Sequence, residues 1–492
     1  MRLPFVVFLA FALGPRAAQA LPNSPSLVLA IQAGTPLNVQ IERMRVALTA
    51  VGNEGRLVLV VPKETRAQEM FAAARAMGAG LDEHLTVISN DEPGPDNDNQ
   101  WIRDRSSGWE ETTPGKFRMI GDDAGDVAGL NNFLSLCTDE QIGFADNRVR
   151  NVYGQGGNII SDGAGNCMAE PGPTAKKFAK AIACTNYIEK PDAELPGHPN
   201  SHTDIAAAFL APGVAVVSAL PAGCEGPEAK VQAEFFDAHA RALEKGKIKV
   251  YRMPLAGPCP VKEAMVLGFP AGPRTPRELN RNDIYKLGAP GEAAVTFRSY
   301  SNLVQLKNAY ILPAFLPPVG IVKSANCVSK KNCRLIPASP ALKAEYEESN
   351  QRARNFLKKL IDDKIIPAKQ ILSLPVTHED AVNGGATRCM TLEVPSDLKA
   401  CSQENFARSS QRALSRFEAM GGCLAQVEDK GAGCGLARHF ADVLGNLAFA
   451  APKTRVKNLG KETGFGLKPE EKARLKPAYV KLQGEIKASC GY

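Results

Sequence analysis

The sequence has few of the residues that build metal sites. Only 6 of its 492 residues are histidine, and its 12 cysteines include no Cys-x-x-Cys pair. Structural zinc sites are built from closely spaced cysteines and histidines, so we expect no metal cofactor. No apolar run beyond the N-terminus approaches the roughly 20 residues that cross a bilayer, which argues against a membrane span. The formal charge of +7 is small and dispersed, and it predicts no nucleic-acid partner.

The N-terminus has the features of a secretory signal peptide. Arg2 supplies the positive start, residues 3–13 form a short apolar run, and Ala18-Gln19-Ala20 is a small-residue cleavage site. We expect residues 1–20 to be removed and the mature chain, secreted or periplasmic, to begin at Leu21. A first core strand is the alternative interpretation of this segment.

In an exported chain, the cysteines are expected to form disulfides. Pairs close in sequence are the first candidates, although sequence alone fixes no connectivity. These pairs are Cys167 with Cys184, Cys224 with Cys259, Cys327 with Cys333, and Cys423 with Cys434. If Cys389 is a thiol, eleven cysteines remain, so one more should be unpaired.

Apolar runs and helical spacing alternate along most of the chain, which is an α/β pattern. Expected strands are 27–31, 56–61, 84–89, 149–152, 158–161, 205–210, 214–220, 248–253, 301–306, 309–312 and 370–374. Expected helices are 37–51, 64–78, 227–245 and 341–359, with loops near 254–290 and 313–340. After Pro395 only helical spacing is found, at 403–420, 435–450 and 469–489. We therefore expect an α/β domain over 21–395 and a helical extension over 396–492 that acts as a packing accessory.

Three separated segments carry chemistry that fits a planar cation. They are Trp101-Ile102-Arg103-Asp104, Ser201-His202-Thr203-Asp204 and the segment 384–391, which contains Cys389. A thiol with an imidazole is a common nucleophile and proton shuttle, and two carboxylates suit the fixed fork of a guanidinium. We expect His202 and Asp204 to open a strand with both side chains on one face.

Each segment has a structural interpretation when it is taken alone. A cysteine in a secreted protein is more often disulfide-bonded than catalytic, and a His-x-Asp is usually a surface or capping pair. The Trp-x-Arg-Asp segment could be a buried aromatic beside a surface ion pair. The occurrence of all three segments in one chain favours an active site.

With these residues, the chain resembles the pentein superfamily of guanidine-modifying enzymes, in particular agmatine deiminases and Porphyromonas-type peptidylarginine deiminases. Five stretches match in order over about residues 25–395. They are Trp101-Ile102-Arg103-Asp104, Gly156-Gly157-Asn158 with Asp162-Gly163, His202-Thr203-Asp204 with Phe209, Ser299-Tyr300-Ser301-Asn302, and Gly384-Gly385 with Cys389-Met390-Thr391.

The resemblance implies a five-module α/β propeller and a role for each catalytic residue. Cys389 would attack the guanidinium carbon, and Asp104 and Asp204 would hold the guanidinium nitrogens. His202 would protonate the departing ammonia and then activate water. No cofactor is implied.

The resemblance also implies residues that bind the substrate. Asn302 would line the pocket, and Trp101 and Asn158 would shape it. Arg103, from the same segment as Trp101, is also expected to bind the substrate. Arg388 stands where the family commonly has a histidine; it would lower the thiol pKa if it faced the sulfur, or pack elsewhere if the segment were a strand.

Two departures affect the expected substrate. Residues 105–108 replace the family's Gly-Pro, and Gln155 stands where agmatine deiminases often have a glutamate that could pair with a free amine. We therefore expect a secreted deiminase of peptidyl-arginine. Agmatine deimination, amidino transfer on a small guanidino substrate, cysteine proteolysis and a non-catalytic arginine-binding role stay open, and the sequence does not indicate an oligomeric state.

Overall fold

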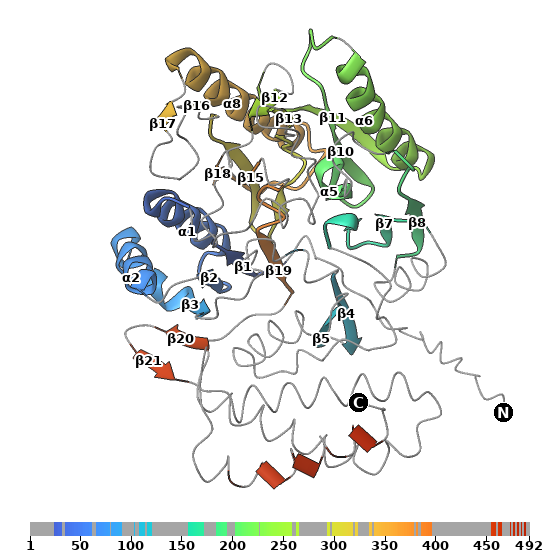
Figure 1. Cartoon of the computed structure of the whole chain (residues 1–492). Helices are drawn as coiled ribbons and strands as arrows, with labels where there is room; N and C mark the ends of the chain where they lie inside the picture. The colour runs from blue at the N-terminus through green and yellow to red at the C-terminus, as the bar shows by residue number, and fades with distance from the viewer. Residues whose placement is uncertain are drawn as a thin grey trace, which may run out of the picture.

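A computed structural model describes much of the chain. The described residues are 24–31, 35–61, 65–78, 80–90, 103, 108–113, 116–120, 156–171, 184–193, 202–225, 227–257, 262–264, 293–295, 298–317, 320–322, 334–336, 339–377, 380–381, 385–395, 454–458, 461–464 and eight positions between 473 and 488. Within them the fold is α/β, with helices α1, α2, α6 and α8 on the outside and the larger sheets further in (Figure 1).

The first sheet follows the sequence pattern closely. Its elements in chain order are β1 (Ser26–Ala30), α1 (Leu37–Val51), β2 (Leu57–Val61), α2 (Thr65–Met77) and β3 (Leu85–Asn90). The three strands are parallel neighbours, and β1 is buried along its whole length. Parallel strands need a crossover connection and are covered on both faces, which is why these runs are almost wholly apolar. The strands and helices predicted here are confirmed.

One strand unit recurs in four sheets. An antiparallel pair of strands is followed by a third strand parallel to the second member of the pair. The first unit is β6 (Ile160–Ser161), β7 (Asn166–Ala169) and β8 (Asn186–Glu189), and the second is β9 (Ala207–Ala211), β10 (Val214–Ala219) and β11 (Lys249–Pro254). The third is β14 (Val304–Gln305), β15 (Ala309–Phe315) and β18 (Gln370–Val376). The fourth is β19 (Thr391–Val394) with β1 and β2. Helix α6 (Pro227–Lys245) makes the crossover in the second unit and α8 (Pro340–Asp362) in the third.

Three further antiparallel strand pairs complete the described strands before the tail. They are β4 (Gly108–Thr113) with β5 (Lys116–Ile120), β12 (Lys262–Ala264) with β13 (Ala293–Val295), and β16 (Gly320–Val322) with β17 (Arg334–Ile336). The prediction of loops near 254–290 and 313–340 is therefore corrected in part. Strands as short as three residues give too little alternation to separate them from a loop.

Three predicted strands differ from the structure. The 158–161 strand is replaced in part by a 3-10 turn, η4 (Gly156–Asn158), and the 205–210 strand begins later, after a helical turn, α5 (Thr203–Ala206). The 301–306 strand is reduced to β14 because residues 300–302 form a turn. In each case side chains or backbone groups of other segments hold the turn, and a one-dimensional pattern does not contain those contacts.

The C-terminal extension is not purely helical. Strands β20 (Thr454–Asn458) and β21 (Lys461–Gly464) form a hairpin, and β20 pairs with β3 at the edge of the first sheet. These polar strands lack an apolar alternation, so the prediction of helices alone is wrong at this point. The predicted helices at 403–420 and 435–450 lie outside the described residues, and the domain boundary at 395 stays a prediction.

Helix α1 joins two of the sheets, because it packs on β1 and β2 and also on β15 and β18. Its buried face includes Met44, Ala47 and Leu48 within one large apolar core. The Cys167–Cys184 disulfide predicted above is confirmed. Cys224 is also disulfide-bonded. In the part of the chain that the structure describes, no helix is long and apolar enough to cross a membrane.

Candidate active site

Cys389 lies in a turn that enters a buried strand. Residues 387–390 form the turn and β19 begins at Thr391. The backbone of the turn is held on both sides, because Ala30 N–H donates to Met390 O at 2.9 Å and Arg103 N–H donates to Cys389 O at 3.2 Å. The Cys389 side chain is 2% exposed and is not part of a disulfide. Cys389 is therefore a thiol, as a nucleophile must be, and its catalytic role stays a prediction.

Asn302 fixes the thiol from the turn before β14. Its Nδ2 donates to Cys389 Sγ at 3.2 Å. Its Oδ1 accepts the backbone N–H of Arg388 at 2.8 Å and that of Cys389 at 3.4 Å. One buried amide therefore orients both the backbone and the sulfur of the nucleophile segment, and as a donor it can stabilise negative charge on sulfur.

The side chain of Asp204, in the helical turn α5, lies beside the thiol. Its side chain is fully buried, and its Oδ2 lies 3.8 Å from Cys389 Sγ. His202 caps this turn with extended backbone, so the prediction that His202 and Asp204 open a strand is wrong. A helical turn still brings the two side chains to one place, because both lie close to Gly157.

Gly157 lies against this pair of side chains. A Cβ built on Gly157 would lie 2.4 Å from His202 Nδ1 and 3.2 Å from Asp204 Oδ1. The adjoining Asn158 ties the same turn to α5, because Thr203 Oγ1 donates to Asn158 O at 3.0 Å. Gly157 thus has to be glycine because a side chain would collide with the imidazole, and not because of an unusual backbone angle.

A cluster of three buried serines, which sequence reasoning missed, supports these segments. The hydroxyls of Ser218, Ser299 and Ser301 lie 2.6 to 3.0 Å from one another. Ser301 also donates to Ile205 O at 2.9 Å. The cluster links β10, α5 and the turn that carries Asn302. The Ser-Tyr-Ser-Asn segment is the sequence signal that could have indicated this cluster.

Arg103 contacts the nucleophile strand. Its guanidinium forms a buried ion pair with Glu393 of β19, and the Trp109 indole donates to Glu393 O at 2.8 Å. Burial lowers the pKa of Arg103 from its ordinary value, and the Glu393 carboxylate opposes that shift. These contacts make Arg103 a support for the Cys389 segment, and its predicted contact with substrate stays a prediction. Trp101 and Asp104 lie outside the described residues.

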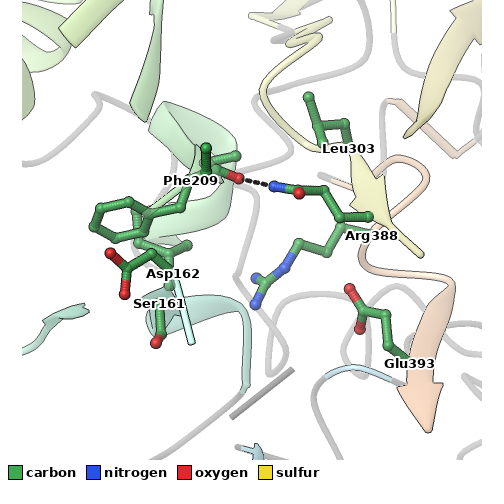
Figure 2. A pocket seen from close by; sticks show the side chains of 10 residues that line it. Ser161, Asp162, Phe209, Leu303, Arg388 and Glu393 are labelled. Carbon is green, nitrogen blue, oxygen red and sulfur yellow. Dashed lines mark hydrogen bonds between the residues drawn. The ribbon is translucent and has the colours of Figure 1, made fainter. Parts of the chain in front are cut away.

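Arg388 faces the same carboxylate as the thiol. Its Nη1 donates to Asp204 Oδ2 at 2.9 Å and its Nη2 donates to Ile159 O at 2.9 Å. Residues 387–390 form a turn, and Arg388 and the Cys389 thiol both contact Asp204 Oδ2. Figure 2 shows its guanidinium reaching into a pocket. The pocket is also lined by Ser161, Asp162, Phe209, Leu303 and Glu393.

Taken together, the described site holds a buried thiol, a carboxylate 3.8 Å from it and an amide donor 3.2 Å from it, with an imidazole two residues from the carboxylate. These are the types of group that binding of a planar cation and attack on it require. Among the described residues, no three His, Cys, Asp or Glu side chains are grouped to bind a metal ion.

Comparisons with known proteins give only distant structural neighbours. No protein-family model and no curated protein matches the chain. A protein provisionally assigned as an agmatine deiminase is 17% identical, with a TM-score of 0.49, over 78% of this chain and 96% of its own. A Cys→Ser variant of C. jejuni agmatine deiminase with substrate bound is 14% identical, with a TM-score of 0.48, over 78% of this chain and 96% of its own.

A third neighbour is the agmatine deiminase of Enterococcus faecalis, 16% identical with a TM-score of 0.46, over 78% of this chain and 97% of its own. At identities and TM-scores this low, the likeness decides neither the fold nor the activity of this chain. Both depend on the geometry above.

Proposed function

We propose that this protein is a secreted guanidino hydrolase that converts peptidyl-arginine to peptidyl-citrulline and ammonia. The observation that carries the proposal is the buried carboxylate of Asp204, whose Oδ2 lies 3.8 Å from the buried Cys389 thiol. A guanidinium bound by that carboxylate has its carbon beside the sulfur. Proximity of this kind supplies a large share of the rate in reactions between two bound groups.

The reaction uses the residues in a fixed order. Cys389 attacks the guanidinium carbon as a thiolate to form a tetrahedral adduct, and His202 gives a proton to one of its nitrogens. Ammonia then leaves this adduct, and a covalent thiouronium remains on the sulfur. Water then attacks that carbon, His202 accepts its proton, and the thiolate departs to leave a urea. The balance is one guanidinium and one water consumed, and one urea and one ammonium formed. Asn302 holds the sulfur through both steps.

The wider fold fits the same proposal. Under this proposal, the four strand units described above would be four of the five modules of a pentein propeller, and the β4–β5 pair would belong to the fifth. Asp104 would be the second carboxylate of the clamp. The Gln155 position, which lacks a carboxylate for a free amine, is the basis for preferring peptidyl-arginine over agmatine as substrate.

Mass spectrometry of the products tests the activity directly. A blocked arginyl peptide and free agmatine are incubated separately with the mature protein. We expect the peptide to gain about 1 Da per arginine as a guanidine becomes a urea, with release of ammonia, and agmatine to react more slowly.

Other outcomes assign other functions. Faster reaction of agmatine would reverse the order of substrates, and product only when an amine is added would indicate amidino transfer. Cleavage of the peptide backbone would indicate a protease. Binding of the peptide without any reaction, by folded protein with Cys389 reduced, would indicate a non-catalytic arginine-binding protein.

Export is the second part of the proposal, and it has its own test. We expect protein recovered from outside the cytoplasm to begin at Leu21, because Ala18-Gln19-Ala20 fits a signal-peptidase site. N-terminal sequencing of that protein makes the measurement. A native protein that retains Met1 or Arg2 in the cell would contradict export and leave the proposed chemistry untouched.

A further inference from the structure

The side chain of Arg388 ends in a guanidinium, which is the group that the proposed reaction converts. It binds Asp204, the carboxylate that is proposed to bind the substrate guanidinium. Its guanidinium donates to Asp204 Oδ2 and to Ile159 O, each at 2.9 Å. The Arg388 side chain is 10% exposed. Its backbone N–H is held by the Asn302 side chain at 2.8 Å. Arg388 therefore links three segments that carry site residues: the one after Gly157, the turn α5, and the turn before β14.

The two oxygens of Asp204 have different surroundings. Oδ2 accepts from Arg388 and lies nearest the sulfur of Cys389. Oδ1 is buried and has no hydrogen-bond partner among the described residues. It lies on the side of Gly157 and His202. A buried carboxylate oxygen without a donor is costly, so Oδ1 is an acceptor suited to an incoming N–H group.

We infer that Arg388 is a positioning residue that binds Asp204 Oδ2 and thereby presents Oδ1 to the substrate guanidinium. The inference rests on the proposed function. Because the Arg388 guanidinium is fixed by two acceptors, it holds the carboxylate in one rotamer before substrate arrives. Asp204 then gives the substrate a contact through one oxygen, while its negative charge is already compensated inside the protein.

Binding and kinetics of Arg388 variants test this role. Affinity is measured by calorimetry with a blocked arginine amide, using Cys389→Ala as the background so that no turnover occurs. In that background, Arg388→Met should raise Kd at least about tenfold, because Asp204 loses a charged hydrogen bond that orients it. With Cys389 present, KM should rise similarly and kcat should change less than about threefold, since the contact is made in the ground state.

Two further variants separate positioning from general damage. Arg388→Lys should recover part of the affinity, because an ammonium can reach one of the two acceptors but lacks the fork that reaches both. Arg241→Met is the matched control, because Arg241 forms an exposed ion pair with Glu234 on α6. Its Kd and KM should equal those of the parent.

Opposite results would overturn the inference. Tighter binding by Arg388→Met would make Arg388 an internal competitor for Asp204, and a Kd within about twofold of the parent would give it no role in binding. If Arg388→Met does not fold, Arg388→Lys decides alone: unchanged or tighter binding rejects positioning. Turnover by wild type separates the two proposals. An inactive wild type rejects the function, whereas an active wild type with unaffected variants rejects only the role of Arg388.

Discussion

Replacement of Cys389 by alanine should abolish formation of the urea product while binding of a blocked arginine amide persists. The thiol is the only described group placed to attack a guanidinium held by Asp204, with 3.8 Å between Sγ and Oδ2. Loss of a nucleophile in an enzyme that forms a covalent intermediate costs on the order of 10⁴-fold or more in kcat. The measurement is product mass from a blocked arginyl peptide over a long incubation, with calorimetry for binding.

The control is Thr49→Ala, because Thr49 is exposed on α1 and bonds only to the backbone of its own helix at Arg45. That variant should keep full activity. Product formation by Cys389→Ala at more than about one hundredth of the wild-type rate would show that another group is the nucleophile. Loss of both binding and product, with a lowered Tm, would mean that Cys389 is needed for folding.

Gly157→Ala should lower kcat by about 100-fold or more. The added methyl would lie 2.4 Å from His202 Nδ1 and 2.9 Å from its Cγ, so the imidazole must move as a whole. His202 has to deliver one proton and accept another at fixed positions, and displacement of about 1 Å is enough for a loss of this size. Steady-state kinetics with the arginyl peptide, together with Tm, make the measurement.

Gly78→Ala is the matched control for this substitution. The nearest atom to its added methyl is Leu81 Cδ1 at 3.6 Å, which is ordinary contact, and Gly78 lies far from the site in sequence at the end of α2. It should show wild-type kcat. A Gly157→Ala enzyme with wild-type kcat would show that the position of His202 in this structure does not matter to the reaction.

The local elements of the first sheet could be predicted from sequence, and the turns of the site could not. Leu57–Val61 is an unbroken apolar run between two helices, and such a run predicts a parallel strand that is buried on both faces. Asp204 lies in a run that equally suits a strand, and its helical turn depends on Thr203 and Ile205 contacting Asn158 and Ser301. Those partners are about 45 and 96 positions away along the chain, beyond the reach of any local pattern.

The identity of the chemical groups came from the sequence, and their arrangement came from the tertiary structure. Residue types in order indicated a thiol, an imidazole and carboxylates for a guanidinium. The sequence left open whether Arg388 faces the sulfur or packs elsewhere, because that depends on whether residues 387–390 are a strand or a turn. The folded chain has a turn there: Asn302 holds its backbone, and Arg388 and Cys389 contact the same oxygen of Asp204. Side-chain contacts between distant segments set that geometry.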